Sequence, residues 1–304
     1  MVSKTLKKFK IKEELLSSPK LSYLLLDTIR QSLACEQFHS FLPVIEYHFK
    51  NLFEGFGFDT SEQLYKIEIL YMFLHTLYKE RQYKKCLNFY AAYSNELQSI
   101  GKMHYYELNP KFKLLYAACL NHAGEVEKAI TVIEKEKQEG LKTWSKTDKN
   151  NLYLNHIVYK YQLEEIKEVS QLILEYFDHS DAFIEKAMGK EWLLKKQIIE
   201  ILIQYDLKNY DQALSRIDSL EKKNKSLFDK QTFKREQAYL SLLKNMIQKP
   251  NEIKGEMFEQ LINEDFDWKP IDEEDIQAIG INSWIRSKHS GNKQYDEFLE
   301  LIKG

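Results

Sequence analysis

Apolar residues recur three or four positions apart through most of this 304-residue chain. Such spacing places them on one face of a helix, whereas the alternation typical of a half-buried strand is rare here. Gly and Pro are scarce, with ten Gly and five Pro in the whole sequence. This scarcity argues against turn-rich all-β folds and against disordered low-complexity chains. The sequence therefore predicts an all-α protein.

The predicted helices are joined by short connections, often centred on Gly or Asn. Short connections make consecutive helices antiparallel neighbours. The periodic segments run over 62–80, 82–98, 110–122, 125–138, 149–162, 164–177, 191–206, 210–223 and 230–247.

An apolar triplet at i, i+3 and i+7 recurs in five segments at a nearly constant interval. Its middle members are Phe41, Cys86, Ala129, Val169 and Ala213, which lie 45, 43, 40 and 44 residues apart. Constant spacing is the signature of stacked structural repeats. Because any amphipathic helix contains such a triplet, an irregular helical bundle is the alternative to a regular array of helix pairs.

The segment 115–133 resembles the tetratricopeptide-repeat family, with a small residue on each of two helices (Ala117 and Ala129) and a turn glycine, Gly124. Segments 208–214 and 81–86 look like the same turn followed by the start of a second helix. The resemblance covers roughly 30–225 and implies a TPR-like α-solenoid of antiparallel helix pairs. The chain departs from the family in its period of about 43 rather than 34 residues. It also lacks the family's Trp and closing Pro, and Cys86 and Val169 replace Ala.

The last part of the chain breaks the repeat pattern and is acidic. Residues 251–304 hold 6 basic and 13 acidic side chains. We predict a helical-repeat array over 1–250 and an acidic helical cap over 251–304, packed on the last pair through Trp268, Trp284 and Phe298. A terminal unit that covers the last apolar face is a general requirement of repeat arrays. A detachable acidic tail is the alternative.

Motifs for catalysis, nucleotide binding and metal binding are absent, and no two His residues lie three or four apart on one helix. Asp178 to Asp181 follows a predicted helix directly and is interpreted as a capping loop. The three cysteines are widely spaced and are interpreted as small buried hydrophobic side chains, without disulfides, in a reducing compartment. We therefore expect no catalytic activity, no cofactor and no metal; an enzyme on an all-α scaffold is the alternative.

The composition also bears on partners and location. Only five of the 44 basic residues are Arg, and Arg is the residue favoured for phosphate and base contacts. No apolar run approaches 18 residues, and no signal peptide is recognised. We therefore expect a cytoplasmic protein that binds neither nucleic acid nor membranes.

The resemblance implies that the first helix of each pair lines a concave groove, and it places ten candidate binding residues there. They are Glu68, Tyr71, His75, Tyr78, Lys79, Lys111, Asn121, His122, Lys195 and Tyr205. Tyr and His present an apolar body with a polar tip, a combination suited to binding surfaces. Packing between helices is the alternative role for these side chains.

Two functions fit these expectations. The first is a non-catalytic scaffold that binds a protein or peptide segment in its groove. The alternative is a ligand- or peptide-sensing bacterial regulator of the TPR-like type that lacks its own DNA-binding domain.

Overall fold

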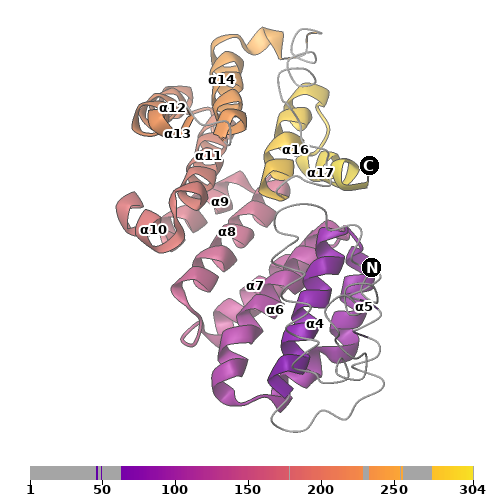
Figure 1. Cartoon of the computed structure of the whole chain (residues 1–304). Coiled ribbons are helices and arrows are strands. Elements are labelled where there is room, and N and C mark those ends of the chain that lie inside the picture. The colour runs from indigo at the N-terminus through magenta and orange to yellow at the C-terminus, as the bar shows by residue number, and fades with distance from the viewer. Residues whose placement is uncertain are drawn as a thin grey trace, which may run out of the picture. The chain divides into compact units, whose positions relative to one another are not determined.

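The fold is all-helical. The computed structural model describes residues 46, 49, 63–177, 179–228, 233–253, 255 and 276–303, and every regular element in these ranges is a helix (Figure 1). The all-α prediction is therefore confirmed. The predicted triplet around Phe41 and the predicted contact of Trp268 lie outside the described residues.

The chain divides into two compact units, Met1–Ser145 and Lys146–Gly304. The C-terminal helices belong to the second unit. The predicted division at residue 250 into an array and a cap stays a prediction.

The described helices of the first unit form two pairs. They are α4 (Gln63–Lys79), α5 (Tyr83–Tyr93), the 3₁₀ helix η2 (Ser94–Ser99), α6 (Lys102–His122) and α7 (Val126–Glu139). α4 contacts α5, α6 contacts α7, and α5 also packs on α6.

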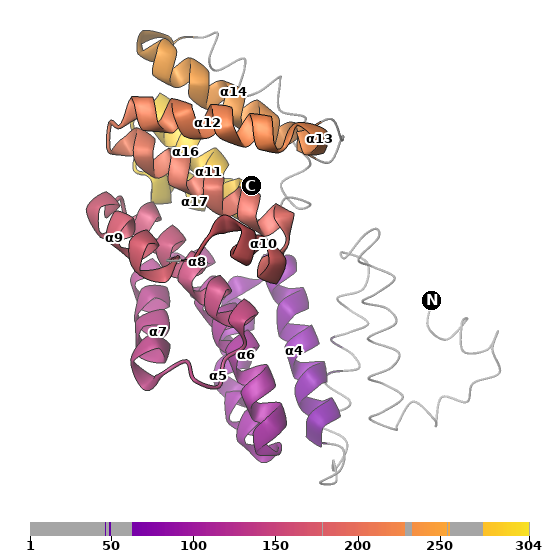
Figure 2. The same ribbon diagram turned by 90° about the vertical axis from the view of Figure 1, so that its left-hand side faces the viewer.

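The second unit continues with helix pairs and ends with two C-terminal helices. Its elements are α8 (Lys146–Gln162), α9 (Ile166–Tyr176), α10 (Asp181–Met188), α11 (Lys190–Asp206), α12 (Tyr210–Lys223), α13 (Lys225–Phe228), α14 (Lys234–Gln248), η4 (Pro250–Glu252), α16 (Ile276–Ser290) and α17 (Gln294–Lys303). Figure 2 shows α12 lying alongside both α11 and α14, which it contacts.

The same turn joins the two helices in four pairs: α4–α5, α6–α7, α8–α9 and α11–α12. Each connection has three residues, and the middle one has a positive φ: 56° at Arg81, 90° at Gly124, 61° at Glu164 and 63° at Lys208. These turn residues are spaced by 43, 40 and 44 positions, the interval that the apolar triplets predict.

The hydrogen bonds of the four turns also coincide. In each turn the N–H after the turn residue donates to a carbonyl five residues earlier, which is the bond of a Schellman helix ending. The bonds are Gln82 to Leu77 at 2.8 Å, Glu125 to Leu120 at 2.9 Å, Glu165 to Lys160 at 3.2 Å and Asn209 to Gln204 at 2.9 Å.

A buried compact residue follows each turn at the same distance. It is the fourth residue of the second helix, namely Cys86, Ala129, Val169 or Ala213, and each is at most 2% exposed. Small side chains let two helices approach closely while larger neighbours fill the groove between them. The turn and the compact residue thus recur together four times within 63–223, and we call this local recurrence the structural repeat.

Several helices differ from the predicted segments. α5 ends at Tyr93, where the 3₁₀ helix η2 replaces the α-helix predicted to residue 98, and α13 was not predicted. α6 begins at Lys102, eight residues before the predicted start, so that Pro110 lies inside the helix. Proline has no backbone N–H, so one hydrogen bond of the helix is missing at Pro110, and the helix continues on both sides of it. α10 was not predicted, because a helix of only eight residues is too short to show a clear apolar period. Its N-cap is Ser180, whose hydroxyl accepts the N–H of Phe183 at 3.4 Å, so the predicted capping role of this segment is confirmed.

Gly124→Ala tests the turn. A left-handed conformation costs an L-residue about 1–2 kcal/mol, and the gain from a stiffer unfolded chain offsets only part of this. We expect a loss of roughly 1 kcal/mol, visible as a fall of about 2–4 °C in the thermal midpoint.

Gly280→Ala is the matched control. Gly280 lies within α16, and a Cβ built there meets no atom within 4 Å. Alanine is the better helix former, so this variant should melt at or above the wild-type midpoint. A Gly124→Ala protein as stable as wild type would contradict the assigned turn.

Candidate functional site

Four of the predicted groove residues follow one side of α4. Glu68, Tyr71 and His75 are half-buried and Lys79 is exposed, at spacings of three, four and four residues. Residues at this spacing lie on one face of a helix. We call these four residues the α4 face.

The Tyr71 ring of the α4 face packs against both α6 and its neighbour on the face. The ring of Tyr71 lies 5.3 Å from that of Phe112 on α6 and 6.1 Å from the imidazole of His75. Lys111, the predicted groove residue on α6, is half-buried and forms an ion pair with Glu107 at 3.5 Å. The α4 face thus combines the aromatic rings of Tyr71 and His75 with the charged side chains of Glu68 and Lys79.

Three other predicted groove residues lie in the interior of the first unit. Tyr78 is 7% exposed, and its ring meets those of Tyr83 at 5.7 Å and His122 at 5.4 Å edge to face. Asn121 is 1% exposed. Because these side chains are enclosed by their neighbours, their role here is packing, and we leave them out of the candidate site.

His122 is held in its neutral form. Burial lowers its pKa from 6.5 to about 4; a bond from Nδ1 to the Ala118 carbonyl at 2.8 Å opposes this effect, and the nearby Arg81 cation adds to it. The imidazole therefore acts as a buried, uncharged hydrogen-bonding group at neutral pH.

The two predicted residues on α11, in the second unit, are half-buried. Lys195 forms an ion pair with Glu191 at 3.2 Å. Tyr205 meets Trp284 of α16 edge to face at 5.3 Å and Tyr210 at 5.5 Å. Burial raises the pKa of Tyr205 to about 12, and the neighbouring Tyr210 and Asp206 act in the same direction.

Asp206, the last residue of α11, anchors α16. One of its carboxylate oxygens accepts the hydroxyl of Tyr161 at 2.6 Å and the indole N–H of Trp284 at 2.8 Å. The other oxygen pairs with Lys288 at 2.6 Å. Trp284 is fully buried, and the cluster that contains it also contains side chains of α8, α11 and α14. α16 therefore covers part of the first-helix surfaces of the second unit.

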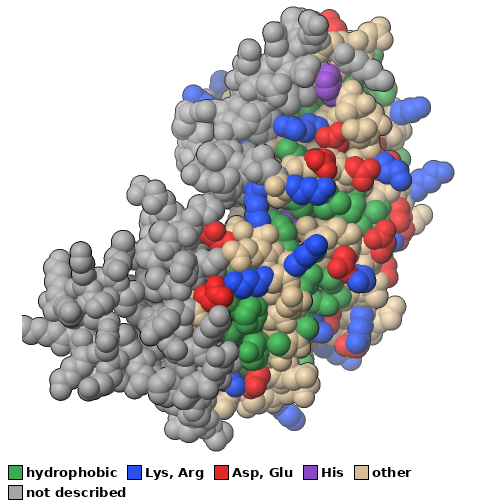
Figure 3. All heavy atoms as spheres, turned by 90° about the vertical axis from the view of Figure 1, so that its right-hand side faces the viewer, with side chains coloured by type: hydrophobic (Ala, Val, Ile, Leu, Met, Phe, Trp, Pro, Cys, Tyr) green, Lys and Arg blue, Asp and Glu red, His purple; other side chains and the backbone are tan. Residues whose placement is uncertain are grey.

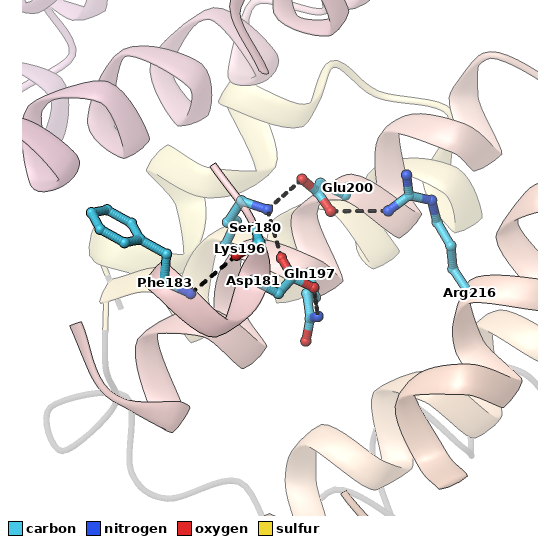
Figure 4. A network of polar contacts seen from close by, with 7 residues as sticks. All are labelled: Ser180, Asp181, Phe183, Lys196, Gln197, Glu200 and Arg216. Carbon is cyan, nitrogen blue, oxygen red and sulfur yellow. Dashed lines mark hydrogen bonds and ion pairs between the residues drawn. The ribbon is translucent and has the colours of Figure 1, made fainter. Parts of the chain in front are cut away.

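A second polar network connects α10, α11 and α12 (Figure 4). The Lys196 ammonium, on a side chain only 6% exposed, pairs with Glu200 at 2.7 Å and with Asp181 at 3.5 Å. Glu200 also pairs with Arg216 at 3.0 Å, and Gln197 donates to Asp181 at 2.6 Å. Two cations thus face two carboxylates, so the network holds three helices together and leaves no excess charge for an ionic ligand.

A shallow pocket of about 460 Å³ lies among α12, α13 and α14. Its lining includes Asp218 and Glu221, whose carboxylates both bind Lys244, at 2.7 and 2.6 Å. One ammonium thus binds both carboxylates, and the pocket lining also includes the basic residues Lys222 and Lys225. The wider surface is also mixed in charge, with basic and acidic side chains interspersed over the described residues that Figure 3 shows.

The described residues include no group of three or more His, Cys, Asp or Glu side chains arranged to hold a metal ion. In the same part of the chain, no helix is both long and apolar enough to cross a membrane. No protein family, curated protein or solved structure matches the chain.

Asp206→Ala tests the anchor of α16. The substitution leaves the Lys288 cation and two buried donors without their acceptor, and breaking a buried pair in this way costs about 3–5 kcal/mol. Urea unfolding should show this loss. Asp211→Ala, at an exposed position in the first turn of α12, should cost less than about 1 kcal/mol. Equal effects of the two substitutions would contradict the anchor.

The neutral state of His122 predicts a pH dependence. The pKa of His122 is lower in the folded state than in the unfolded state. Its contribution to folding stability is therefore fully present above pH 6.5 and is lost as the pH falls toward 4. The loss should reach about 3 kcal/mol. His122→Gln removes the titrating group, and Gln162 occupies the equivalent position beside another turn. The variant should lose stability less steeply between pH 6.5 and 5; identical slopes would contradict the assignment.

Proposed function

We propose that this protein is a non-catalytic scaffold of the TPR-like type that binds a protein or peptide segment. The observation that carries the proposal is the fourfold recurrence of one turn and one buried compact residue over 63–223. Stacked helix pairs create extended surfaces suited to binding another chain. Function still depends on the residues of the surface and not on the fold alone.

Within the described residues, the α4 face is the surface best suited to this role. It presents the partly exposed rings of Tyr71 and His75 between the polar side chains of Glu68 and Lys79. Aromatic side chains with polar tips contribute strongly to interfaces because they bury a large area with few rotatable bonds. In the second unit, by contrast, α16 already covers first-helix residues around Asp206.

The proposal requires neither a cofactor nor a catalytic step. The charged groups of the Lys196 and Asp206 networks are engaged with one another and hold helices together. A surface of half-buried rings and charged side chains is sufficient for a segment that makes contacts without reacting.

Charge reversal on the α4 face tests the proposal. Partners captured by the purified chain are identified, purified and titrated by calorimetry against wild type, Lys79→Glu and Lys84→Glu. Both lysines are exposed, but Lys84 lies on α5. Lys79→Glu should weaken a genuine partner by about tenfold, or roughly 1.4 kcal/mol, while Lys84→Glu leaves its affinity unchanged.

Thermal midpoints of the two variants are compared first, so that unfolding is not mistaken for lost binding. A partner that binds all three proteins equally would place the binding surface elsewhere. The absence of any partner whose affinity depends on Lys79 would overturn the proposed role of the α4 face.

A further inference from the structure

Two buried thiols of the first unit lie against each other. The Cys119 thiol of α6 donates to the Cys86 sulfur of α5, with the two sulfur atoms 3.2 Å apart. Both residues are free thiols, and each is at most 2% exposed. The prediction of buried thiols without a disulfide is confirmed for Cys86 and Cys119. Their contact was not predicted, because only the packing of α5 on α6 brings together residues 33 positions apart.

The structural repeat shows what the same two positions hold elsewhere. The position of Cys86 is taken by Val169 in the pair α8–α9, and the position of Cys119, five residues before the turn residue, is taken by Ile203 in α11. Val169 and Ile203 are buried in one apolar cluster. Packing at these positions therefore does not require sulfur, and the thiol pair adds a chemical capacity to the first unit.

The geometry is close to that of a covalent bond. The sulfur atoms of a disulfide are about 2.05 Å apart, so the two sulfurs need to approach by only about 1.2 Å. We propose that Cys86 and Cys119 form a redox-active pair that hydrogen peroxide converts into an intrachain disulfide joining α5 to α6. This inference is independent of the proposed binding function.

The reaction balances in two steps. One thiol sulfur attacks the peroxide, the O–O bond breaks, and a sulfenic acid and one water are formed. The second sulfur then attacks the sulfenic sulfur; the S–S bond forms, the S–O bond breaks and a second water leaves with the remaining thiol proton. Two electrons pass from the thiols to the peroxide, which is reduced to water.

Burial controls how readily this pair reacts. The hydrogen bond to Cys86 raises the pKa of the Cys119 thiol, and burial raises it further, so the closed structure keeps the pair reduced. Oxidation therefore requires local opening at the contact of α5 with α6. Once formed, the bond ties the pair α4–α5 to the pair α6–α7 and should stabilise the first unit, because it closes a loop in the unfolded chain.

The test uses the full chain carrying Cys35→Ala, in which only the two proposed cysteines remain. The native protein is treated with hydrogen peroxide, quenched, denatured, alkylated with iodoacetamide and analysed by mass spectrometry. We expect loss of both alkylation sites, a peptide linking residues 86 and 119, and return of both thiols after dithiothreitol. The oxidised protein should melt several degrees above the reduced protein.

The double variant Cys35→Ala/Cys86→Ala is the control. It should fold, because Ala129 and Ala213 occupy the equivalent position, and its remaining thiol should form no intrachain bond. Met103, which is 75% exposed, reports whether peroxide reached the protein. Oxidation of Met103 with both thiols still alkylated would overturn the proposal. So would sulfinic acid in place of the disulfide, or a lower melting midpoint of the bridged form.

Discussion

The left-handed residue between the two helices of a pair is the constraint on which the described architecture depends. Because of this residue, the next backbone N–H groups can donate to the last carbonyls of the first helix. The second helix therefore begins at a fixed angle. Only one of the four turns has glycine there; Arg81, Glu164 and Lys208 adopt the conformation with a side chain. A left-handed backbone conformation costs an L-residue about 1–2 kcal/mol, so packing of the two helices must offset this cost in each of the three turns without glycine.

The period of the repeat could be read from the sequence because it follows from this geometry. A compact residue is required at a fixed distance after each turn, and Cys86, Ala129, Val169 and Ala213 satisfy it. Their spacing of 43, 40 and 44 residues is therefore the spacing of the turns. Apolar periodicity likewise predicted the long helices, because each buries one face. Helix α10 escaped prediction since its position depends on contacts such as Gln197 to Asp181, which only the folded chain brings together.

The candidate site was less predictable than the fold, because the burial of its residues depends on neighbouring helices. Counting back from a turn locates a position on the first helix, but it does not reveal what covers that position. Tyr78 and His122 lie at predicted groove positions and are enclosed by Tyr83 and by each other. The contact of Cys86 with Cys119 is also invisible to periodicity, because both residues count as apolar members of separate helices.

One repeated position shows how the fold and the local sequence divide these roles. Two residues before each turn residue stand Lys79, His122, Gln162 and Asp206. His122 and Gln162 are buried, and Asp206 binds two buried donors and a lysine, whereas Lys79 is exposed. Among the four described pairs, the first is thus the one whose turn-proximal position is accessible. The repeated turn fixes the place of this side chain, and the neighbouring helices decide whether it stabilises the interior or lies exposed on the surface. At this position, the first of the four described pairs is therefore the one where the side chain can change without loss of a buried interaction.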